Sequence, residues 1–173
     1  MLIDNGTHSA DIVRYLVGPP AEVHAMEGKR IQGLGVEETV ILSIRSMSGV
    51  LCTIDLSWSV DKKKESYLEI YGTKGAMFLG WTKSIYFEYS SGKSVVVGNG
   101  YNKIKAFRGQ VTNFSRAVRG EENLSISGED AIASVKTVQL AYDALRQNNP
   151  NVFPTLVRAP ADDLATPVIE GAL

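Results

Sequence analysis

Residues 39–58 read TVILSIRSMSGVLCTIDLSW, two apolar stretches separated by a short polar segment. Residues 39–45 are rich in valine and isoleucine, which favour strands. Residues 46–49 combine small polar side chains with a glycine, which is typical of a hairpin turn. From Val50 to Trp58 every second residue is apolar, which is the period of a strand with one buried face. The stretch therefore predicts an antiparallel hairpin.

Further strands are predicted on both sides of this hairpin. The candidate segments are residues 22–27, 66–71, 76–79, 84–89 and 93–97. Most of them are joined by short turns that contain glycine, so neighbouring strands should run in opposite directions. We expect a mostly antiparallel sheet of about six strands whose second face is open.

Helices are predicted before and after the strands. An apolar run ends at Val17 and is followed by Gly18-Pro19-Pro20, which stops a helix, and Asp4 or Asn5 is a candidate cap for its start. This order of elements indicates an α+β fold with the helices packed on one face of the sheet.

Two later helices complete the predicted domain. Phe107, Val111 and Phe114 recur at helical spacing and are interpreted as core residues. Ser127 is the predicted N-cap of a last helix that ends near residue 146. We expect one domain over residues 1–147 and an extended or disordered tail over residues 148–173.

Composition limits the class of protein. The chain has 173 residues, a net charge of −1 and 44% hydrophobic residues, so no global field attracts nucleic acid or an anionic membrane. No apolar run approaches the roughly 18 residues of a membrane span. The only cysteine, Cys52, is interpreted as a core thiol and excludes an internal disulfide. We expect a cytoplasmic protein that binds neither nucleic acid nor membrane.

Asp4 and His8 form the candidate chemical site. The chain has two histidines, and this one lies four residues after a carboxylate, a spacing that places both side chains on one helix face. Such a pair suits acid–base chemistry, although Asp4 as a simple helix cap remains an alternative. Asp11 is interpreted as structural, and His24 as a solvent or interface residue.

Nucleotide and metal motifs are weak or absent in the sequence. Gly33-Leu34-Gly35 is followed by Val36-Glu37-Glu38, without a third glycine or a helix, and is not a dinucleotide fingerprint. A single cysteine excludes a zinc site of several thiolates, and the sequence implies no metal. No nucleophile elbow is present.

Four segments resemble one family in this order. Residues 2–12 (LIDNGTHSADI) followed by YLVG at 15–18 resemble the opening of the C-terminal domain in the glucose–fructose oxidoreductase / inositol dehydrogenase (Gfo/Idh/MocA) family. Residues 68–76 resemble that domain's strand and Gly-Thr-x-Gly turn, and residues 113–120 and 127–131 resemble its late helices. The resemblance covers about residues 2–147.

The resemblance implies a fold and a cofactor. In that family an N-terminal Rossmann domain binds NAD or NADP and carries a catalytic lysine in a Glu-Lys-Pro motif, while the C-terminal sheet builds the substrate pocket and the oligomer interface. This sequence has no Glu-Lys-Pro. We therefore expect a C-terminal domain without its Rossmann domain, with no cofactor site of its own, no metal and no activity alone.

The resemblance also assigns roles to residues. Asp4 matches the aspartate that positions the substrate hydroxyl, and His8 matches the histidine that exchanges its proton. Imidazole suits this role because its ordinary pKa is near neutral. Trp58, in a strand that passes near the pocket by resemblance, and Asn5 are candidate substrate contacts.

The function expected from these observations is a substrate-binding and oligomerisation domain. It would belong to an NAD(P)-dependent oxidoreductase that removes hydride from a sugar, polyol or related hydroxy compound. The open sheet face would pair with a second copy to give a dimer or tetramer. The alternative is a non-catalytic sugar-binding or assembly module that keeps the fold.

Overall fold

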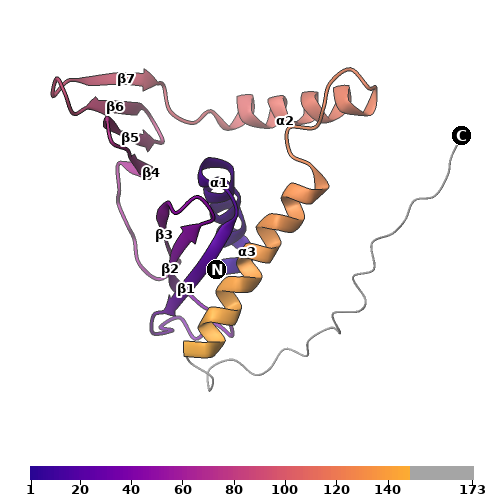
Figure 1. The fold of residues 1–173 in the computed structure, drawn as a ribbon. Coiled ribbons are helices and arrows are strands. Elements are labelled where there is room, and N and C mark those ends of the chain that lie inside the picture. Colours follow the sequence, from indigo (N-terminus) through magenta and orange to yellow (C-terminus); the bar gives the residue numbers. More distant parts are fainter. Residues whose placement is uncertain (149–173) are drawn as a thin grey trace, which may run out of the picture. The chain divides into compact units, whose positions relative to one another are not determined.

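The structure, a computed structural model, describes residues 1–148 (Figure 1). The predicted tail lies almost wholly outside the described residues. The chain forms two compact units, which we describe separately. Unit 1 contains Met1–Ser59 and the segment that begins at Ile132, and unit 2 contains Val60–Ala131.

Unit 1 is built on a three-stranded antiparallel sheet. Its strands are β1 (Pro20–Glu27), β2 (Thr39–Ser46) and β3 (Leu51–Ser57), in the order β1-β2-β3. The predicted hairpin is confirmed as β2 and β3. Val40, Leu42 and Ile44 are buried while the residues between them are exposed, as the alternating pattern requires.

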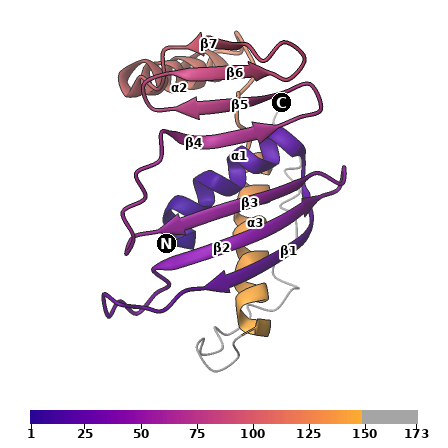
Figure 2. The ribbon, with the colours of Figure 1, turned by 90° about the vertical axis from the view of Figure 1, so that its left-hand side faces the viewer.

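Helical segments cover one face of this sheet (Figure 2). A π-helical turn, η1 (Leu2–Gly6), leads into α1 (Thr7–Val17), and α3 (Gly128–Asn148) crosses the same face. Side chains from all of these elements share one core. Its members are Leu2, Ala10, Ala25, Val40, Leu42, Ile44, Ile54, Val138, Ala141, Ala144 and Leu145.

The start of the first helix differs from the prediction. Neither Asp4 nor Asn5 caps it, because the helical path already begins at Leu2 and both residues lie inside η1. The residue before α1 is Gly6, and no side chain caps α1 there. The end was predicted correctly: Gly18 has a φ of +89° and its N–H donates to the Arg14 carbonyl at 2.9 Å.

Unit 2 contains a separate four-stranded antiparallel sheet. Its strands are β4 (Ser66–Tyr71), β5 (Gly75–Gly80), β6 (Ser84–Glu88) and β7 (Ser94–Gly98), in chain order. The α+β class and the antiparallel pairing are confirmed. Instead of one sheet of about six strands, the described residues form seven strands in two sheets, because β3 and β4 do not pair.

Helix α2 (Lys103–Val118) also belongs to unit 2. Asn102 caps it, since its side-chain oxygen accepts the Lys105 N–H at 2.9 Å. The prediction that its apolar stripe is core was wrong: Phe107, Val111 and Phe114 are 53%, 67% and 60% exposed. No residue of α2 is buried, so no other described element of unit 2 covers this face.

The predicted start of α3 is confirmed. The Ser127 hydroxyl accepts the Asp130 N–H at 3.2 Å, and the Asp130 carboxylate accepts the Ser127 N–H at 2.8 Å. This reciprocal pair satisfies donors that the first helical turn leaves open. Over residues 1–148, no helix combines the length and hydropathy needed to cross a membrane.

Truncating the β2 core should destabilise unit 1 strongly. Leu42 is 2% exposed, and Leu42→Ala is expected to lower the free energy of unfolding by about 2–5 kcal/mol, because it leaves a cavity. The neighbouring Ile41 is 39% exposed on the other face, and Ile41→Ala should cost at most about 1 kcal/mol. Urea denaturation of both variants measures the difference, and equal losses would contradict this assignment of faces.

Candidate functional site

Asp4 and His8 lie on one continuous helical path at the start of unit 1. Asp4 belongs to η1 and His8 to the first turn of α1, so the two residues are about one turn apart. Both side chains are exposed, as is that of Asn5. The structure therefore presents Asp4, Asn5 and His8 to solvent from one continuous helical path.

The junction between η1 and α1 is held by local hydrogen bonds. The Gly6 N–H donates to the Met1 carbonyl at 3.3 Å, across the wider turn. The Thr7 hydroxyl donates to the Ile3 carbonyl at 2.7 Å, and the Ser9 hydroxyl to the Asn5 carbonyl at 3.1 Å. π-helical turns of this kind recur at functional sites.

The other side of the turn packs against β3 at Gly6. Gly6 is buried, and a Cβ atom built on it would lie 3.2 Å from Leu2 Cδ2 and 3.4 Å from Leu56 Cδ1. The tighter of these distances is to Leu2, so glycine leaves room for the Leu2 side chain within the turn, while Leu56 lies at ordinary van der Waals distance. Figure 2 shows the N-terminus beside the end of β3.

Glu37 anchors the start of this turn, although the sequence analysis did not identify it as a site residue. It is 2% exposed, and its Oε1 atom accepts the Leu2 N–H at 2.7 Å and the Tyr142 hydroxyl at 2.8 Å. Burial raises the pKa of Glu37, but these hydrogen bonds, led by the Leu2 N–H, outweigh it and lower the pKa overall. Burial, reinforced by the Glu37 carboxylate, raises the pKa of Tyr142.

Glu38 organises the loop before β2. Its carboxylate accepts the backbone N–H groups of Ile31 (2.9 Å), Gln32 (2.9 Å) and Leu34 (3.4 Å) and the Ser59 hydroxyl at 2.6 Å. Burial opposes ionisation, but the Ser59 and backbone hydrogen bonds prevail and lower the pKa of Glu38 to about 2. The N–H groups around Gly33–Gly35 thus bind the protein's own carboxylate, and this loop does not fit a dinucleotide phosphate.

Asp11 and His24 each have a polar partner within unit 1. Asp11 accepts from the Ser134 hydroxyl of α3 at 2.8 Å and from Arg14 at 3.2 Å, in agreement with its structural interpretation. His24 is exposed on β1, where its Nε2 atom lies 2.6 Å from Glu22 Oε1. Cys52 is half-buried against the core, and burial raises the pKa of its thiol.

Trp58 follows β3, two residues after the leucine that contacts Gly6. The backbone N–H of Trp58 donates to the Glu38 carbonyl at 2.9 Å, and the backbone carbonyl of Trp58 accepts from the Gln32 side chain at 3.1 Å. The indole remains partly exposed. Its role as a substrate contact stays a prediction.

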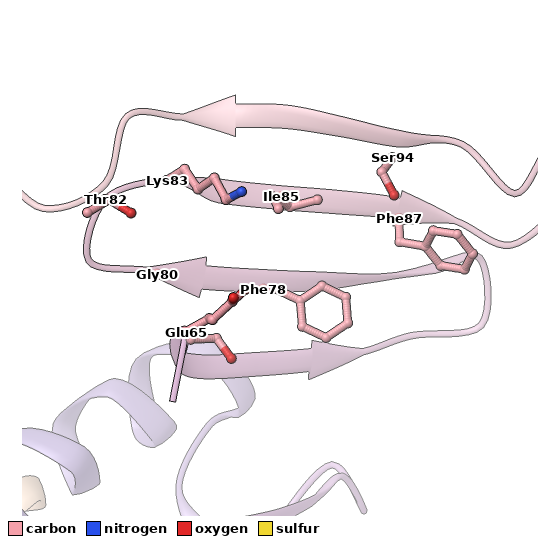
Figure 3. A pocket seen from close by; sticks show the side chains of 9 residues that line it. Glu65, Phe78, Gly80, Thr82, Lys83, Ile85, Phe87 and Ser94 are labelled. Carbon is pink, nitrogen blue, oxygen red and sulfur yellow. The ribbon is translucent and has the colours of Figure 1, made fainter. Parts of the chain in front are cut away.

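Unit 2 carries a groove on the face of its sheet (Figure 3). The groove has a volume of about 710 Å³ and is lined by the apolar Phe78, Ile85 and Phe87 and by Glu65, Ser66, Gly80, Thr82, Lys83 and Ser94. None of the predicted site residues lines it. Over residues 1–148, no cluster of histidine, cysteine and acidic side chains has the arrangement of a metal site.

The sequence model of the GFO/IDH/MocA C-terminal domain matches residues 1–78. This segment belongs to the GFO/IDH/MocA C-terminal domain family. The match contains η1, α1 and the whole sheet of unit 1, and with them Asp4, His8, Glu37 and Trp58. A search of curated proteins gave no significant match.

Solved oxidoreductases share the fold of this chain. An oxidoreductase from Agrobacterium radiobacter in complex with NAD+, L-tartaric acid and magnesium is 18% identical, with a TM-score of 0.70 over 86% of this chain and 47% of that one. A UDP-N-acetylglucosamine 3-dehydrogenase from Acidithiobacillus ferrooxidans is 12% identical, with a TM-score of 0.69 over 82% and 45%. The chain thus spans less than half of the length of these relatives.

Glu38 should make the stability of unit 1 sensitive to acid. Its pKa is lowered from 4.5 to about 2, so the ionised carboxylate stabilises the fold above pH 4.5 and this contribution is lost as the pH falls towards 2. Glu38→Gln should be less stable near neutral pH and should lose less stability over that pH range. Urea denaturation at several pH values measures this.

Glu22→Gln provides the matched control. The hydrogen bond from His24 lowers the pKa of Glu22, and Arg45 adds to it, but this carboxylate is partly exposed. Solvent screening should therefore make its contribution smaller. An acid profile that Glu38→Gln leaves unchanged would contradict the role assigned to Glu38.

Proposed function

We propose that this chain is the substrate-binding part of an NAD(P)-dependent oxidoreductase that acts on a sugar, polyol or related hydroxy compound. The observation that carries the proposal is the exposed Asp4–His8 pair on a helical turn. The start of this turn is anchored by Glu37, which accepts the Leu2 N–H. Membership of residues 1–78 in an oxidoreductase domain family supports it.

The proposed chemistry assigns proton transfer to this chain. Oxidation of a secondary alcohol to a ketone removes a hydride from carbon and a proton from oxygen. We assign the proton to the His8 imidazole, with Asp4 orienting the hydroxyl or the ring. Asn5, between them on the exposed turn, and Trp58 would contact the substrate.

The hydride acceptor would be NAD or NADP, bound outside the described residues. The loop around Gly33–Gly35 does not fit it, because Glu38 uses the loop's N–H groups. The similar oxidoreductase from Agrobacterium radiobacter was solved in complex with NAD+, which supports the same cofactor class here.

Removing His8 should abolish most turnover. We expect His8→Ala, in the complete natural protein that contains this chain, to lower kcat/KM by about 100- to 10,000-fold, because a positioned acid–base group contributes that much. Asp4→Asn should also lower it. Reduction of NAD+ or NADP+ with a panel of polyols and sugars measures the effect.

His24→Ala is the matched control for this experiment. His24 is an exposed histidine of the same unit, on β1 and paired with Glu22, and its loss should leave turnover unchanged. Equal activity of the His8→Ala variant and the wild type would refute the assignment. The rival function, a non-catalytic sugar-binding or assembly module, would then be favoured if the chain binds sugars without turnover.

We also propose that the grooved sheet face of unit 2 joins two copies of the chain. Phe78, Ile85 and Phe87 share this face with Val96, which pairs with Ile85 and is 62% exposed. Tyr71 lies on the same face, where its ring contacts Phe78 with centroids 5.9 Å apart. A second copy would remove this apolar surface from water.

Adjacent residues on β7 test the proposed assembly. Val96→Lys places a charge on the grooved face and should convert a dimer or tetramer to a monomer, because an unpaired charge in an interface is costly. Val95 is 54% exposed and pairs with Tyr86 on the opposite face, so Val95→Lys should leave assembly intact. Size-exclusion chromatography with light scattering measures the mass, and a monomeric wild type would contradict the proposal.

A further inference from the structure

Glu37 is a buried carboxylate for which the proposed proton transfer has no direct use. It does not reach solvent, and its partners include the Leu2 N–H and the Tyr142 hydroxyl. The Met1 ammonium donates to the same Oε1 atom at 3.1 Å, and the Leu2 N–H opens the turn that carries Asp4. Because an ionised group in an apolar core is costly, its retention there needs an explanation.

The position of the Glu37 carboxylate at the start of the helix explains its burial. The first N–H groups of a helix have no partner within the helix, and the N-terminal end carries a partial positive charge. Glu37, which is 35 residues further along the sequence than Leu2, accepts one of these N–H groups and places a negative charge at the N-terminal end of the helix. The helix cap that Asp4 could have provided is therefore provided by Glu37, and the Asp4 carboxylate is left exposed on the surface of the turn.

Helix α3 holds the arrangement in place. The Tyr142 hydroxyl donates to the same Oε1 atom that accepts Leu2, which restricts the carboxylate to one orientation. A second bond, from the Ser134 hydroxyl to Asp11, joins α3 to α1 further along. The path from Leu2 to Asp11 is thus tied at both ends, with Asp4 and His8 between the two ties.

We infer that Glu37, oriented by Tyr142, is the positioning residue of the Asp4–His8 site. This inference rests on the proposed function. Glu37 does not touch the substrate. It holds the turn so that the two exposed side chains keep one geometry, which is the property that acid–base catalysis requires.

The order of the turn is the first test. In the full 173-residue chain, NMR order parameters of residues 3–8 should be those of a rigid backbone, and in Glu37→Gln they should fall below about 0.6. Tyr142→Phe keeps the ring and should produce a smaller change in the same direction. If Glu37→Gln does not fold, Tyr142→Phe tests the same inference.

Glu38→Gln is the matched control, since it changes the adjacent buried glutamate in the same way. Its partners lie in the 31–34 loop and at Ser59, so it should loosen that loop and leave residues 3–8 rigid. A turn that stays rigid in both Glu37→Gln and Tyr142→Phe would overturn the inference. So would an equal loss of order in the Glu38→Gln control.

Kinetics separate positioning from general stability. In the complete natural protein, at a temperature where the variants remain folded, Glu37→Gln should lower kcat by about 10- to 100-fold while KM changes by less than about threefold. Loss of turnover in His8→Ala with an unchanged kcat in Glu37→Gln would overturn the role of Glu37 alone. Unchanged turnover in His8→Ala would instead refute the proposed site, and the positioning role with it.

Discussion

The hydrogen-bonded burial of Glu37 and Glu38 is the constraint on which unit 1 depends. Two adjacent carboxylates with almost no exposed surface precede the central strand, and each needs donors to remain ionised there. Glu37 obtains them from the start of the chain and from α3, while Glu38 obtains them from a loop and from Ser59. Segments distant in sequence therefore converge on the residues that lead into β2.

Because of this arrangement, the residue that caps the first helix is different from the acid that the helix exposes to solvent. A side-chain cap supplied by Asp4 would have used its carboxylate for the helix's own N–H groups. Because Glu37 supplies the cap from outside, Asp4 remains exposed together with His8. The carboxylate of Glu37 is buried and hydrogen-bonded, whereas that of Asp4 is exposed, so the two acids can serve different purposes.

Local patterns explain how much of the fold could be predicted. The alternation through Val40, Leu42 and Ile44, the stop at Gly18 and the Ser127–Asp130 capping pair each depend on a few neighbouring residues, and each is found in the structure. Of the site, the resemblance indicated Asp4 and His8. It did not indicate Glu37, whose role depends on Leu2 and Tyr142, partners that no local pattern brings together. The only local signal was a pair of acids at the start of an apolar strand.

The two long helices show why an apolar period predicts a face but not its partner. In α3, Val138, Ala141 and Leu145 are buried against the sheet of unit 1. The polar Ser134 and Tyr142 of the same helix donate to Asp11 and to the buried Glu37. In α2, Phe107 and Val111 follow an equally regular spacing and are exposed. The difference lies in what surrounds each helix within its own unit. Helix α3 crosses a sheet whose alternation leaves one apolar face to cover, whereas the described residues of unit 2 do not cover the apolar face of α2. Amphipathicity is a property of the helix, and burial is a property of the assembly around it.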